Sequence, residues 1–169
     1  KHPGTKIVLN HTDENVKVVG IAGDSGFVSI NTTKYLMNRE VGFGRKLLQI
    51  LEDLNISWDH MPTGIDDLSV ILRSKELTPI KEQEILKHLI QDLQVDYAEI
   101  EHDLSIIMIV GENMKNQIGV TATATKALSE NNINIQMISQ GSSEVSIMFV
   151  VNQEQEKQAI KALYNVFFN

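Results

Sequence analysis

The sequence lacks the groups that mark several classes of protein. It has no cysteine among its 169 residues, which excludes disulfides, thiolate nucleophiles and cysteine-based zinc sites. It has no basic run, and 15 Lys and Arg against 22 Asp and Glu give a formal charge of -7, so we expect no nucleic-acid partner. No apolar run approaches the roughly 20 residues that cross a bilayer, so we expect no membrane partner and a cytoplasmic location.

Motifs of catalysis and cofactor binding are absent as well. The sequence contains no Gly-x-Ser-x-Gly, no His-Glu-x-x-His, no Walker loop and no dinucleotide fingerprint. The glycine-rich stretch 20–26 lacks the Lys-Ser or Lys-Thr that completes a phosphate loop, and it predicts a hairpin turn instead. The five histidines are not spaced as ligand pairs, so no metal site is predicted. The opening Lys1-His2-Pro3-Gly4 is not a signal peptide, and we expect a piece of a longer protein.

What is present is a globular composition with an internal repeat. Hydrophobic residues make up 42% and charged residues 22%, as in a protein with one ordinary domain or two small modules. When the sequence is shifted by 77 positions, Gly42 falls on Gly119 and the segment 67–70 falls on 144–147 without a gap. Two copies of one module therefore fill most of the chain.

Each copy has the same predicted order of strands and helices. β-Branched and aromatic residues predict first strands at 27–35 and 104–110, and apolar spacing predicts helices that begin at Gly42 and Gly119. The pattern also predicts helix ends at Asn55 and Asn131-Asn132, second strands at 56–61 and 133–138, turns at 62–66 and 139–143, third strands at 68–72 and 145–151, second helices at 82–93 and 154–168, and a further strand at 96–100. This order fits α+β, ferredoxin-like βαββαβ modules, with helices on one face of an antiparallel sheet.

The best chemical feature is the segment Met37–Gly44, which joins a strand to a helix N-terminus. Free N–H groups and the helix dipole favour an anion there, and glycines let a carboxylate approach the backbone. The alternative is that Gly42 and Gly44 only make the turn. The next strand carries Asp59, which is either a partner for an ammonium group or a simply exposed acid; its counterpart in the second copy is Gln136.

These residues resemble tandem ACT domains, and specifically the C-terminal regulatory region of monofunctional, lysine-sensitive aspartokinases. The most specific stretches are His60–Asp67 and Asn132–Glu144, and the resemblance covers essentially the whole chain. Pro3-Gly4-Thr5 resembles the end of the kinase domain.

The resemblance implies regulation. The kinase domain, which phosphorylates aspartate with ATP and Mg, would lie N-terminal to this chain, so no catalytic residue and no cofactor is expected in the chain itself. Lysine, threonine or both would bind the ACT modules and shift the enzyme to an inactive state, with the loop 37–44 as the moving part. Two chains would form a homodimer, with the effector between the first module of one chain and the second module of the other.

The resemblance also implies how the chain is divided. Residues 23–95 would form the first module, inserted into a second module made of residues 1–22 and 96–169. The segment 16–22 would pair in the sheet of the second module.

The effector site carries over residue by residue. The first module would supply Met37, Glu40, Val41, Gly42, Phe43 and Gly44 from the loop, Ser57, Trp58 and Asp59 from the facing strand, and Thr63 and Asp67 from the turn beyond it. The second module would supply Thr121, Asn134, Ile135, Ser143 and Glu144. The loop backbone would hold the α-carboxylate, and Asp59 would hold the side-chain ammonium of lysine. Arg39 and Glu40 depart from the family pattern and the turn 64–66 is longer than in some relatives, so the effector stays open between lysine, threonine and both.

Three other functions remain open from the sequence. The chain is alternatively a stand-alone amino-acid-binding regulatory subunit, a structural dimerisation module without a ligand response, or a small enzyme that uses Asp66, Asp67 and Glu144 as acid–base groups. The enzyme is disfavoured because these carboxylates occupy turn positions and no nucleophile or metal set accompanies them.

Overall fold

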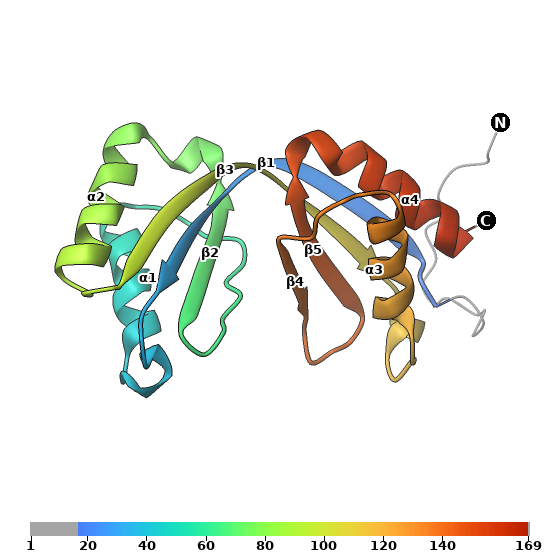
Figure 1. Ribbon diagram of the computed structural model, residues 1–169, viewed down its shortest axis with the longest axis horizontal. Coiled ribbons are helices and arrows are strands. Elements are labelled where there is room, and N and C mark those ends of the chain that lie inside the picture. The colour runs from blue at the N-terminus through green and yellow to red at the C-terminus, as the bar shows by residue number, and fades with distance from the viewer. Residues whose placement is uncertain (1–16, 169) are drawn as a thin grey trace.

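A computed structural model describes residues 17–168 of the chain (Figure 1). Its main elements are β1 (Gly20–Thr33), α1 (Phe43–Asp53), β2 (Asp67–Arg73), α2 (Pro79–Gln91), β3 (Tyr97–Val110), α3 (Val120–Glu130), β4 (Met137–Gln140), β5 (Ser146–Asn152) and α4 (Glu156–Phe168). The strands form one antiparallel sheet in the order β2-β1-β3-β5-β4.

Two long strands join two lobes. β1 and β3 have 14 residues each, and they run from one lobe into the other over the top of an arch (Figure 1). The first lobe holds β2, α1 and α2, and the second holds β4, β5, α3 and α4. In both lobes the helices lie on the outer side, and the sheet faces the gap between the lobes.

The arch bends where both long strands are irregular. Gly26 has a φ of 81° and Asp103 a φ of 57°. The pairing of β1 with β3 shifts register on both sides of Phe27, which lies opposite Leu104. Such bulges bend a strand and increase its twist, so one continuous ladder turns from the first lobe into the second.

Each lobe has its own core between helices and sheet. In α1, Leu47 and Leu51 are buried one turn apart, and Asn55 follows the helix in the left-handed conformation. These residues pack in the first core with Val28 and Val70. The second core has the equivalent composition around Ile107, Phe149, Leu128 and Leu163. A small third cluster at the bend, made of Phe27, Ile71, Leu104 and Val150, connects the inner faces.

The predicted ferredoxin-like fold is confirmed, with the two modules interleaved through their strands. Residues 27–33 of β1 pair with β2 in the first lobe, whereas residues 20–25 pair with 105–110 of β3 in the second. The first part of β3, from Tyr97 to Glu101, pairs with the first-lobe half of β1. The division into 23–95 and 1–22 with 96–169 stays a prediction, and residues 1–16 lie outside the described part.

Several predicted boundaries were wrong. The expected strands 96–100 and 104–110 are one strand, and the strand expected to run to Tyr35 ends at Thr33. The strand expected at 133–138 is β4, which starts at Met137 and takes two residues of the expected turn. The strand expected at 56–61 meets β2 only through isolated bridges, because the N–H groups of Asp59 and His60 both donate to the carbonyl of Ile71.

The hairpin turn predicted for residues 20–26 was also wrong, since this stretch is part of β1. The chain does not reverse there, and the glycines have other roles. A Cβ at Gly23 would lie 2.6 Å from Cδ1 of Ile160 on α4, so glycine lets that helix pack closely on the strand. Gly26 supplies the positive φ of the bend.

Candidate functional site

The connection from β1 to α1 is a tight loop with two left-handed residues. Leu36 has a φ of 59°, a 3-10 turn covers Met37–Arg39, and Gly42 has a φ of 81° just before the helix. Met37 and Phe43 point into the first core and fix the ends of the loop. Val41 between them is 94% exposed, so the loop tip projects into solvent.

Helix α1 begins without a side-chain cap. Gly42 is its N-cap and makes no side-chain hydrogen bond, and a Cβ placed on Gly42 or Gly44 would meet nothing within 4 Å. By contrast, α2 begins with Thr78, whose hydroxyl accepts a hydrogen bond from the N–H of Lys81. An uncapped helix start with open backbone N–H groups is a place where an anion is stabilised.

Glu40 holds the loop together. Its carboxylate lies 2.6 Å from Nζ of Lys34 and 2.7 Å from Nζ of Lys46 on α1. The Lys34 ammonium also donates to the carbonyl of Leu93 and lies 5.6 Å from the centre of the Phe43 ring. Hydrogen bonds from the two lysines, Lys34 first, lower the pKa of Glu40.

The second lobe repeats this arrangement with different chemistry. Gly119 precedes α3 with a φ of 91° and no side-chain cap. The carboxylate of Glu144 accepts a hydrogen bond of 2.8 Å from the N–H of Asn116 in the loop. A depression at this helix start is lined by Gly119, Thr121, Gly141 and Glu144, among others.

Arg73, at the end of β2, lies between two carboxylates. Its Nη2 is 2.6 Å from Oδ2 of Asp24, and its Nε is 4.0 Å from Oδ1 of Asp59. The guanidinium stacks over Phe27, with Cζ 4.1 Å from the ring centre. The Arg73 hydrogen bond lowers the pKa of Asp24, and the same bond raises the pKa of Arg73.

Comparisons with known proteins show which proteins this chain is similar to. An ACT-domain family profile matches residues 107–167. The chain is 50% identical over 165 residues to Aspartokinase 3 of Bacillus subtilis, an alignment that covers 98% of this chain and 36% of that protein. Over nearly its whole length the chain is similar to a regulatory region of aspartokinases. Aspartate kinase of Clostridium acetobutylicum has the same fold with a TM-score of 0.87 at 36% identity, over 94% of this chain and 37% of that one.

A third comparison concerns a relative of similar length. The structure of aspartokinase alpha and beta subunits matches with a TM-score of 0.76 at 25% identity, over 89% of this chain and 98% of that one. The chain thus spans about a third of the first two relatives and nearly the whole of the third.

The aspartokinase site residues expected in the first module lie at two ends of the lobe. The loop 37–44 follows Thr33, whose partner on β2 is Asp67, and the N–H of Lys34 donates to the carbonyl of Asp66. Thr63 is bridged to Leu68 at the same end. The residues 57–59 lie at the other end, next to His60, which is bridged to Ile71 of β2. Ile71 is four residues, or about 13 Å, further along β2 than Asp67. Ser57 and Trp58 line a depression beside the end of α1, with Leu48 and Glu52.

The second-module residues divide in the same way. Thr121 and Glu144 share the depression at the start of α3, next to the exposed Ser143. Asn134 and Ile135 precede β4 at the far end, and Ile135 packs against the second core. Met37 and Phe43, at 6% and 3% exposure, can offer a ligand only backbone groups.

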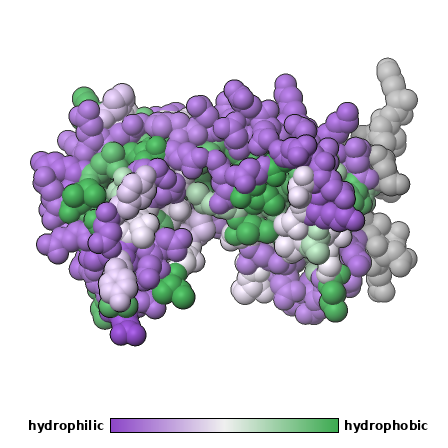
Figure 2. Space-filling model, in the orientation of Figure 1, coloured by the Kyte–Doolittle hydropathy of each residue, from purple (hydrophilic) through white to green (hydrophobic). Residues whose placement is uncertain are grey.

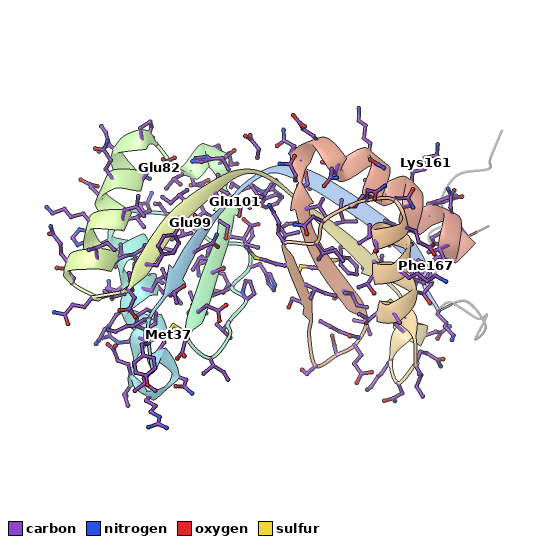
Figure 3. The ribbon with its side chains drawn as sticks, in the orientation of Figure 1. Met37, Glu82, Glu99, Glu101, Lys161 and Phe167 are labelled. Carbon is purple, nitrogen blue, oxygen red and sulfur yellow. The ribbon has the colours of Figure 1, made fainter. Side chains whose placement is uncertain are left out.

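The open sheet face of the first lobe is polar and acidic. Glu99 and Glu101 lie along β3 toward the gap between the lobes, and Met37 lies at the lower end of the first lobe (Figure 3). Tyr97 donates a hydrogen bond to Glu99, which raises the pKa of the tyrosine. Nε2 of Gln136, from the second lobe, donates to Glu101 at 2.5 Å.

The other ionisable groups of the described residues were compared with the requirements of a metal site. Within residues 17–168, no group of three or more His, Asp and Glu could hold a metal ion. His60 is half-buried, which lowers its pKa, and its Nε2 has no hydrogen-bond partner among the described residues. None of the helices described has the length and apolar character to cross a membrane.

Sequence reasoning missed the residues that hold the site in place. Asp24 was hidden in the stretch interpreted as a turn, and Arg73 is 49 residues away from it in sequence. The basic residues Lys34 and Lys46 flank Glu40, and this local charge pattern could have indicated the two ion pairs of Glu40.

Proposed function

We propose that this chain is the amino-acid-sensing region of an aspartate kinase and that it binds lysine, alone or with threonine, to inhibit the enzyme by feedback. The observation that carries the proposal is the uncapped, glycine-flanked start of α1, which suits the α-carboxylate of a free amino acid. The resemblance to lysine-sensitive aspartokinases supports the choice of effector.

Local charge favours the first lobe over the second as the site for the ligand's carboxylate. The segment 34–46 around the start of α1 contains four basic residues and one acid, whereas the equivalent segment 111–123 contains one of each. In the second lobe the Glu144 carboxylate already accepts a hydrogen bond from the loop. A carboxylate ligand is therefore attracted to the start of α1 more strongly than to the start of α3.

Asp59 is the proposed partner of the lysine ammonium. It is 39% exposed, and its position in the second lobe is taken by the uncharged Gln136. The start of α1 and Asp59 lie at opposite ends of one lobe. The distance between them is greater than the about 6 Å that the four-carbon side chain of lysine spans. A single lysine that contacts both groups therefore takes them from the first modules of two chains, whereas the sequence led us to expect both from one first module. We propose a homodimer that brings them together.

The second-module residues Thr121, Asn134, Ile135, Ser143 and Glu144 are proposed to close the site from the partner subunit. The effector inhibits only if it binds the inactive arrangement more tightly than the active one. In the parent enzyme, a kinase domain with ATP and Mg would respond to the dimer geometry that lysine fixes.

Calorimetry tests the proposal on the 169-residue chain. Lysine is expected to bind, and Asp59→Asn is expected to weaken lysine binding while leaving the fold intact. Asp92→Asn is the matched control, since Asp92 pairs with His88 away from the proposed site. Absence of heat with lysine, or unchanged lysine affinity in Asp59→Asn, would contradict the assignment. At 100 times its dissociation constant, lysine should also add about 2.7 kcal/mol to the unfolding free energy.

A second candidate is a regulatory subunit made without a kinase domain. The chain covers 98% of a chain in the structure of aspartokinase alpha and beta subunits, so a protein of this length exists in that system. The full gene sequence decides between the two. A purely structural dimerisation module would associate but show no shift in stability with any amino acid.

A further inference from the structure

Arg73 is held in one position by groups from both lobes. Its guanidinium stacks on Phe27, its Nη1 lies 3.5 Å from the carbonyl oxygen of Ser25, and its Nη2 pairs with Asp24 at 2.6 Å. Phe27 belongs to the first-lobe part of β1, and Asp24 belongs to the part that pairs with Ile106 in the second lobe. The bend at Gly26, which lies between Asp24 and Phe27 in β1, therefore allows both residues to contact one guanidinium.

The same edge of the guanidinium faces Asp59. Nε is 4.0 Å from Oδ1 of Asp59, beyond hydrogen-bond distance, whereas Nη2 is in direct contact with Asp24. A movement of about 1 Å would bring Nε within hydrogen-bond distance of Oδ1 of Asp59 and form a charge-assisted hydrogen bond. Among the groups that hold the guanidinium, Asp24 is the charged one and makes the shortest contact, so it opposes this movement most strongly.

We infer that Asp24 determines specificity for a cationic effector by holding Arg73 away from Asp59. The inference rests on the proposed function, in which Asp59 receives the ammonium of the effector. While Asp24 binds Arg73 directly, the guanidinium makes no hydrogen bond to Asp59, and the Asp59 oxygens stay available to the ligand. When Asp24 is removed, Arg73 pairs with Asp59, and the incoming ammonium meets a neutralised acid beside a guanidinium.

The test is a cycle of variants of the 169-residue chain, titrated with lysine by calorimetry. Asp24→Asn is expected to weaken lysine binding about fivefold, the scale of an exposed ion pair. Arg73→Gln in the Asp24→Asn background is expected to restore the wild-type affinity, because no cation is left to compete for Asp59. Asp92→Asn, which makes the same charge change on α2, is expected to leave lysine binding unchanged.

The role of Asp24 and the binding of lysine at Asp59 can fail independently in this cycle. If wild type binds lysine, Asp59→Asn weakens binding and Asp24→Asn does not, then the role of Asp24 is overturned and the proposed site stands. Failure of the double variant to recover also overturns it. If wild type does not bind lysine, both proposals fall together.

A measurement without ligand keeps the test independent of affinity. In a crystal structure of Asp24→Asn, Arg73 is expected on Asp59 at about 2.8 Å. An Arg73 that stays on Phe27 with Nε still about 4 Å from Asp59 would overturn the inference, even if lysine binding were reduced. Thermal unfolding of each variant verifies that the protein is folded.

Discussion

Gly111, between β3 and the second-lobe loop, is expected to tolerate no side chain. Its φ of 178° is ordinary extended backbone, so the restriction is one of space. A Cβ there would overlap the carbonyl oxygen of Lys17 and lie 3.2 Å from Cγ of Met114. The Lys17 carbonyl belongs to the segment that enters the second lobe, which cannot move without leaving the core. We expect Gly111→Ala to displace this segment.

The magnitude follows from what the segment contributes. Val18 is 2% exposed in the second core, and burying such a side chain stabilises by about 1.5–3 kcal/mol. The N–H of Val19 donates a 2.8 Å hydrogen bond to the carbonyl of Val110, worth about 0.5–1.5 kcal/mol. Loss of both predicts that Gly111→Ala lowers the unfolding free energy by about 2–4 kcal/mol.

Urea unfolding followed by circular dichroism measures the loss. With a slope of about 2 kcal/mol per M, the midpoint should fall by about 1–2 M. Gly141→Ala is the matched control, because its Cβ would meet only Oγ of Ser143 at 3.9 Å, and its midpoint should change little.

The mechanism itself can be refuted by additivity. If the methyl group added by Gly111→Ala expels the segment, Val18→Ala should cost almost nothing more in the Gly111→Ala background. Full additivity of the two substitutions, or a Gly111→Ala midpoint equal to that of wild type, would refute the reasoning.

Two further predictions concern the loop before α1. Because Lys34 and Lys46 lower the pKa of Glu40, the contribution of Glu40 to stability is present above its ordinary pKa of 4.5 and is lost as the pH falls through the lowered pKa. When unfolding is measured at decreasing pH, Glu40→Gln should lose less stability than wild type over that range. Equal losses in the two proteins would contradict a stabilising role of the Glu40 ion pairs. Gly42→Ala should cost about 1 kcal/mol in thermal unfolding because of its φ of 81°, whereas Gly44→Ala, which meets nothing within 4 Å, should be neutral or stabilising by up to about 1 kcal/mol; equal melting temperatures would refute the difference.

The fold could be predicted wherever local pattern and tertiary structure agree. The helices after Gly42 and Gly119 begin where expected, because apolar spacing reports directly which face is buried. The stretch 20–26 could not be predicted, because Gly23 makes room for Ile160 on α4, more than 100 residues later in the sequence, and Gly26 serves the bend. A turn and a closely packed strand have the same local composition.

The site could be predicted only in part for a related reason. The repeat located the loop and the equivalent positions in the second copy, but it gave no information on how Arg73 is placed beside Asp59. The contact of Asp24 with Arg73 depends on the bulge at Gly26, and the register shift around Phe27 is not visible in the sequence pattern. Hydropathy shows a similar limit, since the face in Figure 2 mixes green apolar areas with a largely polar surface and marks no single site.

The two copies use equivalent positions for different physical tasks. Lys34 before the first loop forms an ion pair with Glu40, whereas its counterpart Gly111 makes room for the chain that enters the second lobe. Asp59 remains exposed beside Arg73, whereas its counterpart Gln136 donates to Glu101 across the gap. Together with the bond from the N–H of Gly26 to Gln153 and the pair of Arg73 with Asp24, that contact ties the lobes at the bend. Asp59, which we propose faces a ligand, and Asp24, which helps to fix the lobes, therefore meet at Arg73, so a change in charge at Asp59 should act directly on the contact between the lobes.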